Sequence, residues 1–214
     1  MTRIVLDRGM IRDIAPDVLD AEGQLRVMPA AYYRSTTLEE RALLGVRHGL
    51  YGLPTQELID WLIDKINGRC AIEIGAGHGA LARALGIVAT DSRLQEAPHI
   101  AAYYAALGQP VVQYGAQVQK LDAAEAIAHH RPQVVIASWV TQRCQDAHVG
   151  AVGSVFGVDE AAVIADVETY ILIGNTNVHA HKVIWALPHE RLTPDWLFSR
   201  AFNGSADFIA IWGE

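Results

Sequence analysis

Three glycines at alternate positions, Gly75, Gly77 and Gly79, directly follow the short apolar run 71–74. A glycine turn after a buried strand lets the main chain approach a ligand that a Cβ atom would repel. The helix that follows such a turn also favours an anion at its N-terminus. Asp91 ends a second apolar run, from which its carboxylate can accept hydrogen bonds from the two hydroxyls of a ribose. The pattern therefore predicts a nucleotide pocket.

Glu73 lies inside the first apolar run, just before the turn, and it narrows the choice of nucleotide. A pyrophosphate gains nothing from a carboxylate nearby, whereas a cofactor that carries an ammonium and a sulfonium centre does. Asp91 also follows Gly75 by only 16 residues. A dinucleotide-binding fingerprint places its acid about 20 residues on. Both features favour S-adenosylmethionine over a nicotinamide dinucleotide.

The stretch EIGAGHG (73–79) resembles the first motif of class I S-adenosylmethionine-dependent methyltransferases, and VATDS (88–92) resembles the acidic end of their second strand. From about residue 38 to 214 the order of expected elements also follows this family. The resemblance implies a seven-stranded sheet whose last strand is antiparallel, with S-adenosylmethionine at the ends of the first three strands. The cofactor-binding residues that it implies are Glu73, Gly75, Ala76, Gly77, His78, Gly79, Asp91 and Ser92, with Arg93 beside the adenine.

The loop that contacts the adenine in this family is expected near residues 115–117, where the family has an acidic residue. Gln117 stands there instead, and Asp122 follows a few residues later. Either side chain can serve, so the sequence leaves the adenine contact open, with Gln117 taken as the cofactor-binding candidate. Tyr51 and Thr55, in the segment YGLPTQ, are candidate lid residues, although Thr55 also suits a helix cap.

Polar residues that could act on a methyl acceptor follow the fourth and fifth expected strands. The segment ASWVTQR lacks the acidic or Asn residue, Pro-Pro and aromatic of the base amino-methyltransferases, which disfavours a base amine as the acceptor. Ser138 and Trp139 are candidates for binding the acceptor there, and Asn175 joins them after the fifth strand. His179 is the candidate general base, because its ordinary pKa lies near neutrality. His179 and His181 form an HxH pair without an acidic third ligand nearby, so we expect no metal site.

The elements that must position these residues alternate between strand and helix. Apolar runs predict strands at 71–74, 87–90, 111–114, 133–140, 169–174, 182–187 and 207–213. Capping signals at Thr37, Thr55, Asp122 and Asp159 predict helices after each of them. We expect a doubly wound, mostly parallel α/β sheet with helices on both faces, with one of the last two strands antiparallel at an edge. Residues 1–68 are expected to form an N-terminal extension with helices, and 69–214 the Rossmann-like core of a single domain.

Composition limits the partners and the compartment. The chain has 214 residues, of which 51% are hydrophobic and 19% charged, and its formal net charge is −7. We do not expect nucleic acid as a partner, because such proteins usually present a basic face. No apolar stretch approaches the roughly 20 residues that span a bilayer. Cys70 and Cys144 lack metal or disulfide spacing, and the N-terminus does not read as a signal peptide, which favours a cytoplasmic protein.

The sequence therefore predicts a cytoplasmic S-adenosylmethionine-dependent methyltransferase that acts on a small molecule or another accessible nucleophile. One alternative is an NAD(P)-dependent Rossmann oxidoreductase, although the chain lacks the Tyr–Lys spacing of the short-chain reductases. The other is a non-catalytic S-adenosylmethionine-binding regulatory module, because no recognisable catalytic motif follows the fourth strand. The methyl acceptor and the oligomeric state do not follow from the sequence.

Overall fold

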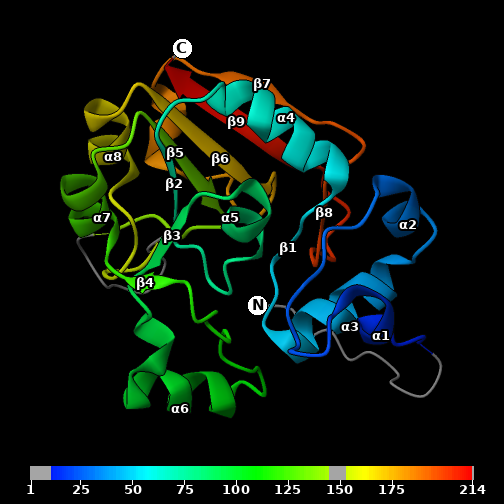
Figure 1. Ribbon diagram of the computed structural model, residues 1–214. Coiled ribbons are helices and arrows are strands. Elements are labelled where there is room, and N and C mark those ends of the chain that lie inside the picture. Colours follow the sequence, from blue (N-terminus) through cyan, green and yellow to red (C-terminus); the bar gives the residue numbers. More distant parts are fainter. Residues whose placement is uncertain (1–10, 145–152, 214) are drawn as a thin grey trace.

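A seven-stranded, mostly parallel sheet forms the centre of the computed structural model, which describes residues 11–144 and 153–213 (Figure 1). Its strands lie in the order β4-β3-β2-β5-β6-β9-β7. They comprise β2 (Ala71–Ile74), β3 (Val88–Asp91), β4 (Gln119–Lys120), β5 (Val134–Ser138), β6 (Thr169–Asn175), β7 (Glu190–Leu192) and β9 (Asp207–Gly213). β9 runs antiparallel to both of its neighbours, β6 and β7. The mixed α/β, Rossmann-like architecture is thus confirmed, but the antiparallel strand lies inside the sheet and β7 forms the edge.

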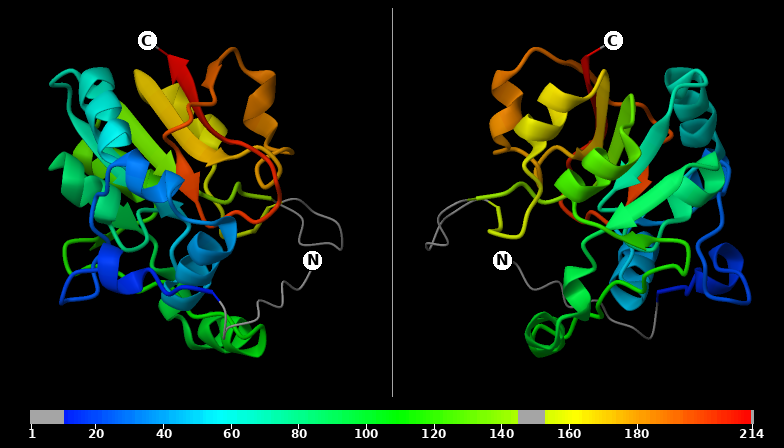
Figure 2. Two further views of the ribbon diagram at one scale, coloured as in Figure 1. Left: turned by 90° about the vertical axis from the view of Figure 1, so that its right-hand side faces the viewer. Right: turned by 60° about the vertical axis from the view of Figure 1, so that its left-hand side comes forward.

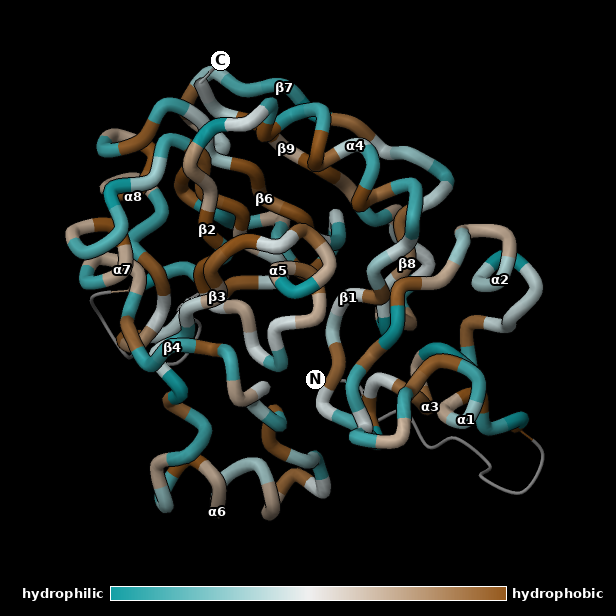
Figure 3. The backbone as a smooth tube through the Cα atoms, in the orientation of Figure 1, coloured by the Kyte–Doolittle hydropathy of each residue, from teal (hydrophilic) through white to brown (hydrophobic). Residues whose placement is uncertain are grey.

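The central strands are buried on both sides, which explains their largely apolar composition. Ile72 and Ile74 of β2 pack in one cluster with side chains of α7 (Ala123–His130) and α8 (Glu160–Asp166). Ile136 of the neighbouring β5 packs in another cluster with α4 (Gln56–Ile66) and α5 (Ala80–Leu85). Figure 3 shows hydrophobic residues along β6 and β9 in the interior of the molecule.

The helix caps form as the sequence predicts. Thr37 accepts a hydrogen bond from the backbone N–H of Glu40 at 3.2 Å, and the Glu40 carboxylate accepts one from the Thr37 N–H at 2.9 Å, which begins α3 (Leu38–His48). Asp122 and Glu125 form the same reciprocal pair at the start of α7. Thr55 caps α4 by accepting from the N–H of Leu58. These three starts depend on residues three apart in the chain, and each is confirmed.

The two predictions of strands at 111–114 and 182–187 are wrong. The N–H of Val112 donates to the side chain of Gln95 at 2.8 Å, not to a strand, and the sheet edge is formed further on, by β4. Residues Val183–Ala186 form a short 3-10 helix, η2, because buried Lys182 binds Glu160 and the indole N–H of Trp185 donates to the His179 carbonyl. The place next to β9 that the 182–187 strand would have filled is taken by β7.

A segment before β2 packs against the carboxyl ends of the parallel strands (Figure 2). It contains α1 (Ala15–Val18), α2 (Ala30–Arg34), α3 and β1 (Gly52–Leu53), and β1 pairs with β8 (Phe198–Ser199). Its own apolar cluster includes Tyr33 and Leu44 and reaches the sheet domain through Ala80 of α5. The remaining helices are η1 (Leu94–Glu96) and α6 (Pro98–Ala106), which projects away from the sheet in Figure 1. No helix among the described residues has the length and apolar character needed to cross a membrane.

Candidate functional site

The turn between β2 and α5 requires its three glycines. Gly75, Gly77 and Gly79 have φ angles of +58°, +54° and +74°, in the left-handed region that other residues rarely adopt. A Cβ added to Gly75 would lie 2.6 Å from a methyl carbon of Val140, and one added to Gly79 would lie 2.7 Å from a methyl carbon of Val118. The turn therefore needs left-handed backbone angles and leaves no room for side chains at Gly75 and Gly79.

Asp91, at the end of β3, holds this turn from the neighbouring strand. One carboxylate oxygen accepts from the Gly77 N–H at 2.9 Å, and the other accepts from the Arg93 N–H at 2.7 Å. Burial raises the pKa of Asp91 above its ordinary value, although both hydrogen bonds oppose this change. Each carboxylate oxygen can accept a further hydrogen bond. Asp91, the residue predicted to bind a ribose, thus lies at the turn, and two backbone amides fix the position of its carboxylate.

Glu73 is a buried carboxyl group directly beneath the turn. Its side chain is 2% exposed, and one oxygen accepts from the Ala82 N–H in α5 at 2.9 Å. Burial raises the pKa of Glu73 to about 8; the bond from Ala82 lowers it, and the charge of Asp91 raises it further. A carboxyl group inside a strand is costly unless it has a partner. The single hydrogen bond from Ala82 offsets only part of the cost of burial, so a nearby cation would favour the ionised form of Glu73.

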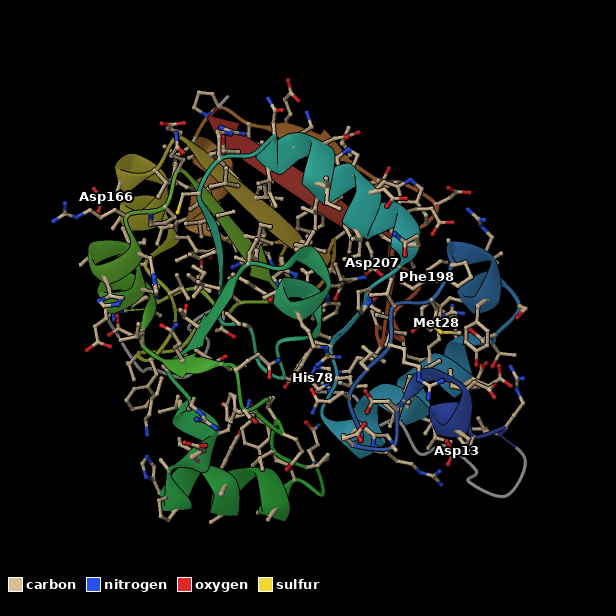
Figure 4. The ribbon with its side chains drawn as sticks, viewed as in Figure 1. Asp13, Met28, His78, Asp166, Phe198 and Asp207 are labelled. Atoms are coloured by element: carbon tan, nitrogen blue, oxygen red, sulfur yellow. The ribbon has the colours of Figure 1, made fainter. Side chains whose placement is uncertain are left out.

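A cavity of about 90 Å³, here called the turn cavity, opens beside Glu73. It brings together residues from several parts of the chain that are distant in the sequence. They include Tyr51 and Gly52 from the N-terminal segment, Ser138 and Trp139 at the end of β5, and Glu73, Gly75, Ala76, Gly77 and His78 from β2 and the turn. Asp207, at the start of β9, also lines it, and Figure 4 labels His78, Phe198 and Asp207. Sequence reasoning missed Asp207, because no motif surrounds it.

His78 and Asp207 show how strongly this region is desolvated. Burial lowers the pKa of His78 to about 4, so its ring is neutral at pH 7. Its Nε2 atom is buried and has no hydrogen-bond partner among the described residues. Burial raises the pKa of Asp207, which accepts hydrogen bonds from Asn175 and Ser199. An orphaned polar atom of this kind, beside a cavity, is consistent with a site that is completed by a ligand.

A larger cavity of about 870 Å³, here called the outer cavity, meets the turn cavity at Tyr51 and Trp139, which line both. The two rings lie 6.0 Å apart between centroids. Trp139 has a φ of +60°, unusual for a residue with a large side chain, and its N–H donates to the Ile173 carbonyl at 2.9 Å. Strained backbone of this kind is concentrated at functional sites. Trp139 therefore forms part of the wall between the two cavities.

His179 lines the outer cavity, whereas Asn175 lines neither the outer cavity nor the turn cavity. Nδ1 of His179 lies 2.9 Å from the Asn175 backbone nitrogen and 3.2 Å from the Asn175 carbonyl oxygen, so Asn175 holds the ring in place. Burial lowers the pKa of His179 to about 4, and the charge of Lys182 adds to this effect. The Asn175 amide donates to Ser205 and Asp207 and accepts from Asn203. Asn175 thus organises loops rather than facing a ligand.

A third cavity, of about 250 Å³, lies on the other side of the turn and is lined by Gly75, Ser92, Leu121 and Asp122, among others. Gln117 does not line it; this residue is exposed, and its amide lies next to the backbone of Gly79 and Gly115. Of the two adenine-contact candidates from the sequence, the structure places only Asp122 in a cavity that also contains Ser92. Among the described residues, no cluster of three or more His, Cys, Asp or Glu side chains could hold a metal ion.

Comparisons with known proteins do not assign this chain to a family. No protein-family model matches the chain, and no curated protein sequence matches it. Among solved structures, the chain is similar to a crystal structure of a Thermoplasma acidophilum protein, 1320, with 14% sequence identity and a TM-score of 0.34. The match covers 73% of this chain and 87% of that protein. At this TM-score the likeness does not bear on the fold or the function of this chain.

Proposed function

We propose that this chain is an S-adenosylmethionine-dependent methyltransferase with a doubly wound α/β fold, helices covering both faces of its sheet. The observation that carries the proposal is the position of Glu73, a buried carboxyl group beneath a left-handed glycine turn and on the wall of the turn cavity. A dinucleotide would bring a pyrophosphate to this turn, where its negative charge would oppose the ionisation of Glu73 and gain nothing from the ionised form. An amino-acid ammonium gains from the same carboxylate, which supports S-adenosylmethionine over NAD(P).

The residues around the turn fit the parts of S-adenosylmethionine. Glu73 would hold the ammonium, Asp91 the ribose hydroxyls, and Asp122, in the third cavity, the adenine. Gly75 lines both the turn cavity and the third cavity, so a ligand that occupies both must pass over it. A Cβ atom at Gly75 would clash with Val140, so a glycine keeps the turn in the position that this path needs. When bound, S-adenosylmethionine supplies a methyl group on a positively charged sulfur.

The chain's own residues would contribute alignment and exclusion of water. The acceptor would enter the outer cavity and reach the turn cavity at Tyr51 and Trp139, whose rings limit access of water to the line of transfer. Because burial lowers the pKa of His179 to about 4, its ring is a weak base, and an acceptor that needs no prior proton removal fits this site better than one that needs a base.

A non-catalytic S-adenosylmethionine-binding module is the second candidate, and one observation favours it. Asn175 and His179, the polar residues expected after the fifth strand, are bound to each other and to neighbouring loops. A site that retains the cofactor pocket but lacks a free base is compatible with regulation by cofactor level. Tight binding of S-adenosylhomocysteine, with no methyl transfer to any acceptor in a labelled-methyl screen, would favour this candidate.

Calorimetric titration with S-adenosylmethionine, S-adenosylhomocysteine and NADH tests the cofactor assignment. We expect both adenosyl compounds to bind and NADH not to bind. Asp91→Asn should weaken the binding of both, because Asn cannot accept hydrogen bonds at two oxygens. Asp64→Asn is the matched control, since Asp64 is an exposed acid on α4 that lines none of the three cavities. Binding of NADH alone would overturn the proposal.

A further inference from the structure

The outer cavity is lined by cationic and neutral groups in a chain that is acidic overall. Its described lining residues include Arg200, Lys182, His179 and His181, and no Asp or Glu is among them. The whole chain carries a formal net charge of −7, so this local excess of positive charge runs against the average. A cavity wall of one sign raises the local concentration of ligands of the opposite sign. The ligand of this cavity should therefore be negatively charged.

Lys182 does not supply the unbalanced charge. Its ammonium is buried and donates to the carboxylate of Glu160 and to the Val140 carbonyl, the latter at 3.0 Å. Glu160 also accepts from the hydroxyl of Tyr170 at 2.8 Å. This buried pair is internally neutral and ties the segment after Trp139 to α8. A ligand would have to break the pair to use Lys182, at the cost of leaving Glu160 buried and unpaired.

Arg200 supplies a charge that has no such partner. In the described part of the chain its guanidinium has neither an ion pair nor a hydrogen bond. The guanidinium carbon lies 3.7 Å from the centroid of the Tyr51 ring, a cation–π contact that leaves the N–H groups available at the edge of the guanidinium plane. A planar guanidinium of this kind can bind a carboxylate or phosphate with two parallel hydrogen bonds.

The position of Arg200 is fixed before any ligand arrives. Its backbone N–H donates to the carbonyl of Tyr51 at 3.0 Å, immediately after β8. Its aliphatic stem packs against Gly45 of α3, where an added Cβ would lie only 2.3 Å from the Cβ of Arg200. Gly45 and Tyr51 of the N-terminal segment thus hold an arginine about 150 residues later in the chain against the outer cavity. Preorganisation of this kind reduces the entropy lost on binding.

From this geometry we infer that Arg200 binds the anionic group of a small methyl acceptor, a carboxylate or a phosphate, in the outer cavity. The volume of about 870 Å³ suits a small molecule. Because Arg200 stacks on Tyr51, which also lines the turn cavity, an acceptor anchored there would have its nucleophile directed towards Trp139. That the ligand is a methyl acceptor rests on the proposed function, whereas the anion site rests on Arg200 alone.

Ligand-observed NMR on the full chain, with and without S-adenosylhomocysteine, tests this inference with three probes. These are 4-hydroxybenzoate, 4-hydroxyphenyl phosphate and the uncharged 4-hydroxybenzamide. We expect at least one anion to bind the wild type about tenfold or more tightly than the amide, as hydrogen bonds to a charged group imply. The stronger of the two anions distinguishes a carboxylate acceptor from a phosphate acceptor.

Variants of Arg200 and Arg26 distinguish a direct contact between Arg200 and the anion from a general effect of the net charge. Arg200→Gln should reduce binding of the favoured anion to the level of the amide, and Arg200→Lys should retain part of it, because the charge stays while the bidentate geometry is lost. Arg26→Gln, at an exposed arginine that lines none of the three cavities, removes the same net charge and should leave binding unchanged. If Arg200→Gln does not fold, as judged by thermal unfolding, Arg200→Lys against Arg26→Gln gives the comparison.

Each outcome decides the question. Equal binding of anions and amide to the wild type, failure of both anions to bind, or unchanged anion binding when Arg200 is replaced would overturn the inference. Binding of anions through Arg200 without any binding of S-adenosylhomocysteine would leave the anion site in place and refute the proposed methyltransferase. Binding of S-adenosylhomocysteine without anion selectivity would leave the cofactor assignment in place and refute the anion site.

Discussion

Glu73 should release a proton when S-adenosylmethionine or S-adenosylhomocysteine binds. With a pKa of about 8, Glu73 is protonated in roughly nine-tenths of the unliganded molecules at pH 7. A ligand ammonium close to the carboxyl group favours the ionised form and lowers this pKa. Binding at pH 7 should therefore release close to one proton per site from Glu73.

Glu73→Gln isolates this effect, because a glutamine can still accept the hydrogen bond from Ala82. Calorimetric titration in buffers of different ionisation enthalpy counts the released protons. The wild type should release nearly one proton more than Glu73→Gln, and Asp64→Asn should match the wild type. Equal proton release by wild type and Glu73→Gln, with tight binding to both, would refute the placement of the ligand ammonium at Glu73.

The same group makes the stability of the unliganded protein depend on pH. The folded pKa of about 8 lies above the ordinary value of 4.5, so the folded state keeps a proton that the unfolded state loses as pH rises. Stability should therefore fall with rising pH through this window. Relative to Glu73→Gln, the wild type should lose about 2–3 kcal/mol between about pH 5 and about pH 7. Urea unfolding at both pH values measures the difference, and a pH dependence that is the same in both proteins would contradict it.

Three further predictions concern the frame of the site. Gly75→Ala should abolish S-adenosylhomocysteine binding in calorimetry, whereas Gly86→Ala, which carries a similar left-handed strain of about 1–2 kcal/mol but has open space around it, should only reduce stability. Thr55→Ala should lower the free energy of unfolding in urea by about 1 kcal/mol, because α4 loses its cap; an unchanged value would show that the cap is not needed. Glu160→Gln should destabilise the fold by about 3 kcal/mol, because it leaves the charge of buried Lys182 without its counterion. A loss below about 1 kcal/mol in the same urea assay would mean that the pair is not energetically coupled.

Features that depend on residues close together in the sequence could be predicted from it. The cap at Thr37, with Glu40 three residues on, needs only one turn of chain. The turn at Gly75 could be located because glycine is the residue that adopts its φ of +58° without strain. The placement of Asp91 against this turn followed from the adjacency of two parallel strands. In each case the determining contacts lie within one helix turn or between consecutive strands.

Contacts between distant segments decided the rest. The apolar run 182–187 is a plausible strand by composition, but the buried bond from Lys182 to Glu160 fixes it outside the sheet. Arg200 carries no motif in the sequence, and its role depends on Gly45 and Tyr51, which lie about 150 residues earlier in the chain. The sequence by itself determined the turn and the carboxylates that would bind a cofactor. Only the tertiary structure determined which side chains enclose the outer cavity, because desolvation and charge balance there are properties of the assembled fold.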